Sequence, residues 1–299
     1  MTELRFNELR GEEVAYAAHR QERTLLPDAA DCPLCPGPAG EVGEEPFEVA
    51  VFENRFPAFS PPHGSSEVVV YTDEHEGSFG GLAPERTEAL MGVWRERYAE
   101  LAARPDVHYV LIFENRGEET GATLHHPHGQ IHAYPFLPPV PAAERGADAR
   151  RGGCAVCALA AEEMAAGERV LFEEGAAVAY VPHAARWPYE VHVTFPEHRA
   201  SLLDLSSTEM RDFGTGLQRV TRAYDAMWER TFPYMLVLHQ QPTDGLGGGH
   251  LHAELYTPLR APDRLKHLAG GEQGSGTFTV DVMPERAAAE LREAAARAG

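Results

Sequence analysis

The stretch His126-Pro127-His128-Gly129-Gln130 has the residue types and the spacing of a histidine that attacks phosphate. In an extended strand, residues two positions apart face the same side, so His126 and His128 are predicted to lie side by side. A neutral imidazole is both a nucleophile and a leaving group near neutral pH. Gln130 follows on the same side, and its amide can donate a hydrogen bond but cannot protonate a leaving group. We therefore expect His128 to hold a transferred group until a second phosphate accepts it.

Four cysteines form two CxxC pairs, and each pair begins the same order of residues. The order is CxxC, a single histidine and then HxH, with intervals of 40 and 51 residues in the first half and 41 and 52 in the second. The runs 67–75 and 190–198, which both end in Glu-His, match as well. So long a period predicts two copies of one supersecondary unit rather than a solenoid.

Each CxxC pair with its two histidines supplies the four sulfur and nitrogen ligands that tetrahedral zinc prefers. The first ten residues do not resemble a secretion signal, and in such a chain a CxxC pair more often binds metal or has a redox role than forms a disulfide. A closed shell of four ligands would orient the strand of His128 and take no part in the chemistry. The alternative is unpaired thiols with surface histidines. The two predicted zinc sites are Cys32, Cys35, His75 and His126, and Cys154, Cys157, His198 and His250.

Composition limits the classes of partner. The chain has 299 residues, 43% of them hydrophobic, which allows one large core or two of about 150 residues each. A formal net charge of -20 repels polyanions, so we expect no nucleic-acid partner. No run of 18 apolar residues occurs, so we expect no membrane segment and a cytoplasmic protein.

The pattern of apolar and turn-forming residues predicts an α+β fold of two halves, each an antiparallel sheet with helices, packed on each other as one compact unit. A helix is predicted over 84–103, and Ser206 with Glu209 forms a capping box for a second helix that runs to about Arg230. The polar stretch 142–153 is expected to join the halves. Without a glycine-rich phosphate loop, a dinucleotide-binding fold is not supported. The predicted strands are 49–52, 68–72, 109–114, 177–181, 191–195 and 234–238.

The block Phe113-Glu114-Asn115-Arg116-Gly117, together with the HPHGQ stretch, resembles the active-site block of the galactose-1-phosphate uridylyltransferase family. This family is the transferase branch of the histidine-triad superfamily, whose hydrolases are similar but carry a third histidine at the position of Gln130. The resemblance implies two tandem histidine-triad-like half-domains, 1–145 with the catalytic site and 146–299 with sugar-phosphate contacts. It implies that His128 takes UMP from UDP-glucose and passes it to galactose 1-phosphate in a ping-pong reaction of galactose metabolism.

The resemblance also implies further site residues. Lys266 and Glu272 match the family's hexose-phosphate segment, although Gly271 replaces a tyrosine and 277–279 stands near a glutamine of the family. By contrast, His183, His192 and His267 are expected to be ordinary polar or surface histidines. The residues implied to contact the nucleotide or its phosphates are Arg20, Arg23, Asn54, Asn115 and Thr123.

Some relatives bind iron near the second half instead of a second zinc. That pattern falls on Glu144, His239, His252 and Glu254, and Glu254 stands where the family has histidine. We therefore expect a second Cys2His2 zinc site in preference to an iron site.

Three functions are compatible with the sequence. The first is the uridylyltransferase reaction, for which relatives are commonly homodimers. The second keeps the histidine intermediate but uses ADP-glucose and inorganic phosphate, as in nucleotide-sugar phosphorylase relatives that share the second CxxC. The third is a nucleotide-binding module whose histidines only hold zinc.

Overall fold

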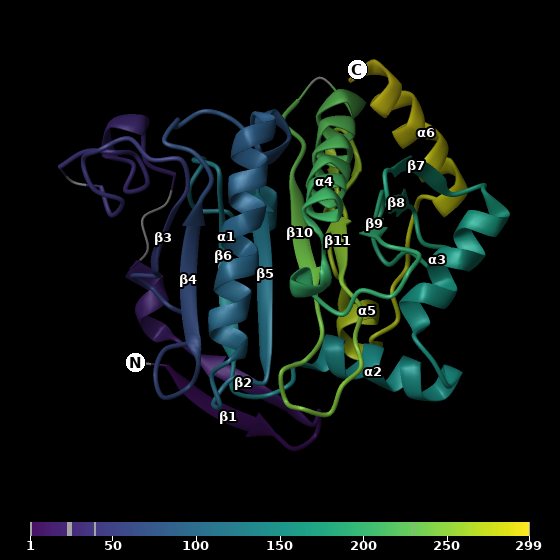
Figure 1. Ribbon diagram of the computed structural model, residues 1–299, viewed down its shortest axis with the longest axis horizontal. Helices are drawn as coiled ribbons and strands as arrows, with labels where there is room; N and C mark the ends of the chain where they lie inside the picture. The colour runs from purple at the N-terminus through teal and green to yellow at the C-terminus, as the bar shows by residue number, and fades with distance from the viewer. Residues whose placement is uncertain (1, 23–25, 39, 229, 299) are drawn as a thin grey trace.

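The computed structural model describes residues 2–22, 26–38, 40–228 and 230–298 (Figure 1). One antiparallel sheet of nine strands runs through this part of the chain, in the order β3-β4-β6-β5-β10-β11-β9-β8-β7. The predicted α+β class with an antiparallel sheet is therefore confirmed. The strands are β3 (Ala50–Glu53), β4 (Ser65–Val70), β5 (Tyr109–Arg116), β6 (His128–Tyr134), β7 (Val170–Glu174), β8 (Ala177–Tyr180), β9 (Val191–Thr194), β10 (Tyr234–His239) and β11 (His252–Tyr256).

The two halves of the sequence are joined edge to edge, because β5 pairs with β10 in the middle of the sheet. The halves therefore share one continuous sheet, whereas the sequence predicted two units packed on each other. Pairing β5 with β10 satisfies backbone groups that two separate sheets would leave on exposed edges. From this seam outward the strands run β5, β6, β4, β3 on one side and β10, β11, β9, β8 on the other, where β7 adds a further strand at the edge. The matched order is what an internal duplication predicts.

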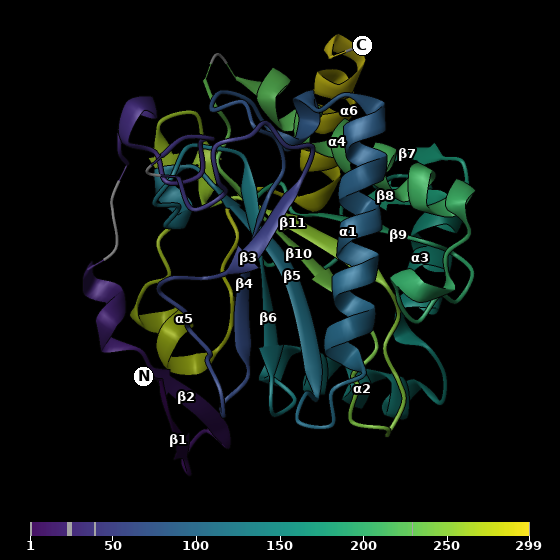
Figure 2. The same ribbon diagram turned by 60° about the vertical axis from the view of Figure 1, so that its left-hand side comes forward.

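Helices α1 and α4 lie side by side across one face of the sheet, and α6 packs against α4 (Figures 1 and 2). The predicted capping box is present at the start of α4, where the Ser206 hydroxyl accepts from the Glu209 N–H and the Glu209 carboxylate accepts from the Ser206 N–H. This helix ends at Met227, before the predicted end near residue 230, because Trp228 is extended. The bounds are α1 (Pro84–Ala102), α4 (Ser207–Met227) and α6 (Pro284–Arg297).

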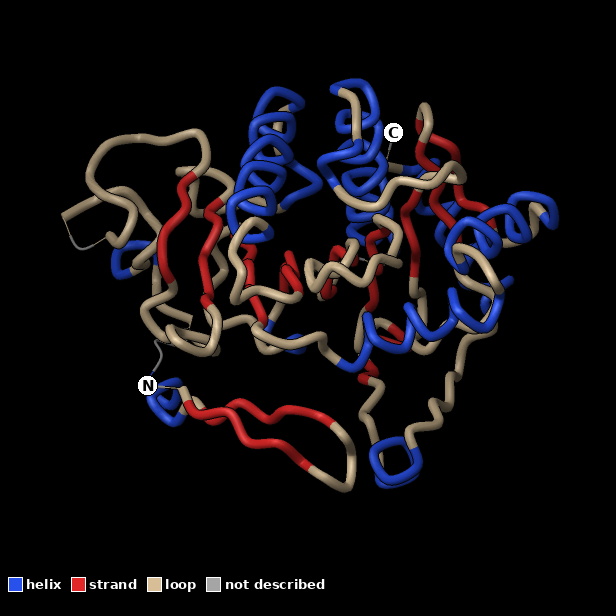
Figure 3. The backbone as a smooth tube through the Cα atoms, turned by 60° about the horizontal axis from the view of Figure 1, so that its bottom comes forward, coloured by secondary structure: helices blue, strands red, loops and turns tan. Residues whose placement is uncertain are grey.

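The stretch 142–153, predicted to be a connection, lies mostly in helix α2. Alanine, glutamate and arginine are good helix formers, and Gly152 ends the helix with a φ of 69°, which only glycine adopts at little cost. Figure 3 shows the β1–β2 ribbon beside the N-terminus, set apart from the large sheet. Among the described residues, no helix is both long and apolar enough to cross a membrane. The remaining elements are α2 (Pro139–Arg151), α3 (Ala155–Ala166), α5 (Gly270–Ser275), β1 (Glu3–Asn7), β2 (Glu12–Tyr16), β12 (Leu259–Ala261), β13 (Arg264–Leu265) and the 3-10 helices η1 (Ala18–Glu22), η2 (Ala29–Asp31), η3 (Phe79–Gly81), η4 (Glu118–Thr120) and η5 (Leu202–Asp204).

The sheet divides its side chains between a core face and an open face. On β6, Ile131 is fully buried in the core beneath the helices, so His128 and Gln130, which alternate with it, face the other side. On β11, Ala253 is buried in the same core, and His252 therefore shares the face of His128. The equivalent histidines of the two halves lie on one side of a continuous sheet.

Candidate active site

His128 begins β6 and its ring is partly buried. Its Nδ1 atom lies 2.7 Å from the carbonyl oxygen of His126, so the Nδ1–H group donates and Nε2 carries the lone pair. Burial lowers the pKa of His128, which keeps the ring neutral at neutral pH. A neutral imidazole with a free Nε2 lone pair is the form that a nucleophile requires.

Two cavities meet at His128. The smaller one, of about 240 Å³, combines apolar and aromatic surface with amides and a hydroxyl. The larger one, of about 630 Å³, is polar and charged. A cavity with aromatic walls next to one lined mainly by polar and charged residues can accept a base on one side of His128 and charged groups on the other. The smaller cavity is lined by Leu34, Phe52, Asn54, Phe56, Thr123 and Gln130, among others, and the larger by Asn115, Arg116, Glu118, Glu119, His125 and Arg230, among others.

The Gln130 side chain is held by Asn54. Asn54 donates from Nδ2 to Gln130 Oε1 at 3.3 Å, while its own Oδ1 accepts from the Phe56 N–H at 2.8 Å. Because the Gln130 carbonyl oxygen is engaged, its NH2 group is the part left to donate to a ligand. Of the residues implied to contact the nucleotide, Asn54 and Thr123 lie in the smaller cavity with Gln130, and Asn115 lies in the larger one.

The sequence interpretation overlooked His132, which follows Gln130 by two residues and faces the same side. Burial, followed by the charge of Arg20, lowers the pKa of His132 to about 3. His132 therefore cannot act as a general acid near neutral pH, and it does not replace the third histidine of the hydrolases. The same interaction locates Arg20 near the His132 end of β6. Arg23 lies outside the described residues.

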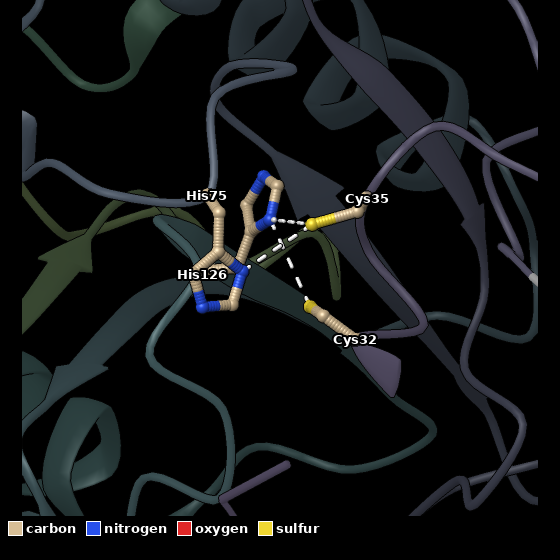
Figure 4. A group of neighbouring side chains, drawn as sticks. All are labelled: Cys32, Cys35, His75 and His126. Carbon is tan, nitrogen blue, oxygen red and sulfur yellow. Dashed lines mark hydrogen bonds between the residues drawn. The ribbon is translucent and has the colours of Figure 1, made fainter. Parts of the chain in front are cut away.

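The first predicted metal group is assembled, with Cys32, Cys35, His75 and His126 converging on one point (Figure 4). Cys35 Sγ lies 3.3 Å from His75 Nδ1 and 3.5 Å from His126 Nδ1. A tetrahedral zinc site places sulfur and nitrogen ligands about 3.6 Å apart. The Nε2–H group of His126 donates to the Thr72 carbonyl oxygen at 2.7 Å, which leaves the Nδ1 lone pair facing the sulfurs. The group is compatible with zinc.

The second predicted group is also assembled, from Cys154, Cys157, His198 and His250. His250 Nδ1 lies 3.3 Å from Cys154 Sγ and 3.2 Å from Cys157 Sγ. Burial, with the neighbouring thiol of its pair, raises the pKa of Cys157 to about 12, so only a bound cation would make it a thiolate at neutral pH. His252 donates from Nδ1 to the His250 carbonyl oxygen at 2.8 Å, which repeats the contact between His128 and His126.

Comparison with known proteins decides the family. The family profiles "Galactose-1-phosphate uridyl transferase, N-terminal domain" and "C-terminal domain" match residues 59–138 and 144–298. A galactose-1-phosphate uridylyltransferase of Thermotoga maritima is 38% identical, over 98% of each chain. The chain belongs to the galactose-1-phosphate uridylyltransferase family.

Further members of this family, and a more distantly related structure, are also similar to this chain. The Streptomyces lividans enzyme of the same name is 36% identical over 98% of this chain and 87% of its own length. A solved uridylyltransferase structure superimposes with a TM-score of 0.88 at 31% identity, and 99% of each chain is covered. An ADP-glucose phosphorylase of Arabidopsis thaliana, at 22% identity and a TM-score of 0.75, shares the fold.

The segment that was expected to contact the hexose phosphate lies away from His128. Lys266 is buried and pairs with Glu272, with 2.5 Å between Nζ and Oε1. Among the described residues, neither Lys266 nor Glu272 lines either of the two cavities at His128. Figure 1 shows α5, which carries Glu272, toward the end of the sheet opposite to the arrowhead of β4, and Val70 at that arrowhead pairs with His128.

A third group of possible metal ligands lies on the open face of the second half, where Glu144, His239, His252 and Glu254 come together. The sequence ranked this set behind the second Cys2His2 group, but the structure forms both, and they share no residue. His252 Nε2 lies 3.7 Å from the Glu144 carboxylate and 3.9 Å from that of Glu254. Because Nδ1 of His252 is the donor to His250, Nε2 presents a lone pair to two carboxylates. A cation fits such a cluster of acceptors.

His192 belongs to the edge of this third group, although it was expected to be an ordinary polar residue. Its Nε2 atom lies 3.0 Å from Glu190 and 3.5 Å from Glu254. Hydrogen bonding to Glu190 and the charge of Glu254 outweigh burial and raise the pKa of His192. The Glu190 carboxylate also accepts from the backbone N–H groups of Arg186 and Trp187. The Glu190–His192 pair is therefore satisfied by protein groups alone.

Proposed function

We propose that this chain is a UDP-glucose–hexose-1-phosphate uridylyltransferase that moves UMP from UDP-glucose to galactose 1-phosphate through a covalent uridylyl-His128 intermediate. The observation that carries the proposal is the His128 ring. Its Nδ1–H group is engaged by His126, its Nε2 lone pair is free, and the Gln130 amide lies beside it where two cavities meet. Membership of the family supports the substrates.

In the first half-reaction, His128 Nε2 attacks the α-phosphorus of UDP-glucose. The Nε2–P bond forms, the bond from phosphorus to the bridging oxygen breaks, and glucose 1-phosphate leaves with that electron pair. The ring becomes positively charged, and the His126 carbonyl oxygen stabilises it through the Nδ1–H hydrogen bond. The Gln130 NH2 group donates to an α-phosphoryl oxygen as negative charge develops there.

In the second half-reaction, a phosphate oxygen of galactose 1-phosphate attacks the same phosphorus. The new P–O bond forms, the Nε2–P bond breaks, and neutral His128 is regenerated with UDP-galactose. Neither leaving group needs a proton, because a hexose 1-phosphate leaves as an anion and the ring leaves neutral. An amide at position 130 therefore suffices.

The two cavities provide separate places for the nucleoside and the phosphates of UDP-glucose. We propose that the base and ribose occupy the smaller cavity, against Phe52 and Phe56, with Asn54 and Thr123 as polar contacts. The phosphates would lie at His128, within reach of Asn115 on the larger-cavity side. Arg20 and Arg23 would contribute phosphate contacts from the N-terminal segment, since arginine forks suit phosphate oxygens.

We propose that both Cys2His2 groups hold zinc and that it is structural. Zinc on the first group would fix His126 and, through its carbonyl oxygen, the ring of His128. For the third group, with Glu144, His239, His252 and Glu254, iron or another divalent cation is the secondary proposal.

The hexose contacts are proposed to come from a second copy of the chain. Lys266 and Glu272 line neither His128 cavity among the described residues, so a single chain leaves the sugar without them. The β1–β2 ribbon exposes large apolar side chains, and its Leu9 is 98% exposed. A homodimer could cover that ribbon and complete the site. In this proposal residues 1–145 carry the catalysis and residues 146–299 supply the sugar contacts, in a cytoplasmic enzyme without membrane or nucleic-acid partners.

The test is to incubate the zinc-loaded protein with UDP-glucose alone or ADP-glucose alone and to measure its intact mass. The proposal predicts an acid-labile uridylyl adduct that galactose 1-phosphate discharges and that His128→Asn abolishes. The exposed His108→Asn variant is the control. An adenylyl adduct discharged by inorganic phosphate would instead establish the ADP-glucose phosphorylase reaction, which the second CxxC favours. No adduct with either sugar nucleotide would leave a nucleotide-binding module.

A further inference from the structure

A buried carboxyl group lies on the core side of β5, the strand that pairs with the His128 strand, and its residue also borders the larger cavity. Glu114 of β5 is 4% exposed and points away from the open face, toward the helices. The Tyr234 hydroxyl donates to its Oε1 atom at 2.9 Å. Within the described part of the chain, the Oε2 atom has no hydrogen-bond partner. The nucleotidyl transfer proposed above gives this carboxyl group no role.

Tyr71 connects this carboxyl group to the His128 strand. The Tyr71 N–H donates to the Pro127 carbonyl oxygen at 3.0 Å. Its hydroxyl lies under Gly129, because a Cβ atom built on Gly129 would be only 2.3 Å from it. This hydroxyl is also buried and, among the described residues, has no hydrogen bond of good geometry, yet it is near enough to Glu114 for each to shift the pKa of the other.

The protonation of Glu114 decides what the Tyr71 hydroxyl can do. As a carboxylate, Glu114 accepts hydrogen bonds only, so both tyrosine hydroxyls must donate to it. As a carboxylic acid, it can donate through Oε2, and the Tyr71 hydroxyl can then become an acceptor. Either arrangement would give Glu114 Oε2 and the Tyr71 hydroxyl a hydrogen-bond partner. The Tyr71 hydroxyl would, however, point in a different direction beside Gly129 in each of them. A buried hydrogen-bond network stabilises the fold when every polar atom has a partner, and it destabilises the fold when one partner is missing.

Burial of Glu114 places its ionisation near neutral pH. Burial raises the pKa of Glu114 to about 7, against the opposing effects of the Tyr234 hydroxyl and of Arg116. Asp225 of α4, which forms an ion pair with Arg116 at 2.7 Å, raises it further. The groups that face Glu114 are therefore Tyr71, Tyr234, Arg116 and Asp225.

We propose that Glu114 is a positioning residue for nucleotidyl transfer, acting through Tyr71 on the backbone that joins His128 to Gln130. The proposal rests on the function proposed above. Gly129 is the only residue between the nucleophile and the amide, so a shift of its backbone changes the distance of both groups from the phosphate. A displacement of about 1 Å is enough to cost on the order of 100-fold in rate.

The test compares wild type, Glu114→Gln and Tyr71→Phe as zinc-loaded full chains. The rate of adduct formation with UDP-glucose is measured from pH 5.5 to 9 by quenched intact-mass analysis. The rate of adduct formation by wild type is expected to change with pH through an ionisation near pH 7. The rates of both variants are expected to lack this change. We expect about a tenfold lower plateau rate for Tyr71→Phe, the size of a modest misplacement. Tyr98→Phe, whose buried hydroxyl donates to Gln241 and not to Glu114, is the matched control and should keep the wild-type profile.

Thermal unfolding provides a second readout that does not depend on activity. A buried acid with a raised pKa stabilises the fold below its unfolded pKa, and that stability is lost as the pH rises through the folded value. Between pH 4.5 and 7 the Tm of wild type should therefore fall relative to that of Glu114→Gln. If this difference is seen but the adduct profile of Glu114→Gln equals that of wild type, Glu114 ionises without positioning His128 and the proposal is overturned. No adduct in wild type would instead remove the function on which it rests.

Discussion

The Nδ1 atom of His128 lies 2.7 Å from the carbonyl oxygen of His126. His126 therefore has two tasks, because its ring faces the cysteines of the first metal group while its backbone sets the tautomer of the nucleophile. His252 and His250 repeat the contact in the second half. There, however, Nε2 faces carboxylates instead of a substrate cavity, so we expect catalysis only in the first half.

The two proposed zinc sites should differ in their effect on catalysis. Cys35→Ser and Cys157→Ser are each expected to lower bound zinc from two ions to one per chain, measured by elemental mass spectrometry. Cys35→Ser should also reduce uridylyl-adduct formation by 10-fold to 100-fold, because the His126 that orients His128 loses its anchor. Cys157→Ser should lower the Tm but leave adduct formation within about twofold of wild type, because His252 contacts no substrate. Equal losses of adduct in the two variants would contradict this division.

Replacing the Gln130 amide should make water, instead of galactose 1-phosphate, the acceptor of UMP. In Gln130→His, an imidazole ring would stand next to the phosphorus and could accept a proton from the attacking water. We expect UMP release from UDP-glucose to rise by about 100-fold, the lower range of general acid–base effects, while transfer to galactose 1-phosphate falls. Chromatography of the nucleotide products measures both. Gln130→Asn keeps an amide and should not increase hydrolysis. An adduct with the wild-type lifetime in Gln130→His would refute the role given to Gln130.

Gly129 should tolerate no side chain. A Cβ atom would lie 2.3 Å from the Tyr71 hydroxyl and 3.0 Å from the Phe113 carbonyl oxygen, and the second of these is backbone that cannot move aside. Gly129→Ala should destabilise the fold by about 1–3 kcal/mol in urea denaturation and slow adduct formation. Gly153→Ala meets no atom within 4 Å and serves as the matched control. Adding Tyr71→Phe should recover part of the lost stability, and no recovery would show that the hydroxyl is not the obstacle.

The proposed contribution of a second chain to the hexose site can be tested by complementation. His128→Asn and Glu272→Gln should each be inactive in transfer to galactose 1-phosphate. If Glu272 acts across a dimer interface, a mixed dimer has one intact site, so re-equilibrated equal mixtures should regain about a quarter of wild-type activity. Sedimentation analysis confirms the mixed dimer. Recovery should be absent if both residues must come from the same chain.

Much of the site could be predicted from the sequence because it depends on local geometry. The period of two in a strand places His128 and Gln130 on one face, and β6 has this arrangement. The CxxC turns and their repeated spacing predicted both Cys2His2 groups, since a short turn alone brings two thiols together. The capping box of α4 was predicted for the same reason, because its two hydrogen bonds join residues three apart.

Only the tertiary structure decided which distant segments meet. The pairing of β5 with β10 fuses the halves, and it depends on burying both inner edges rather than on any local pattern. Helix α2 brings Glu144 to His239 and His252, although its sequence suggested a linker. Tyr71, Glu114 and Tyr234 come from three strands or strand ends and are joined in the core by the fold alone. Contacts of this range reflect the burial of whole faces, which no short run of residues encodes.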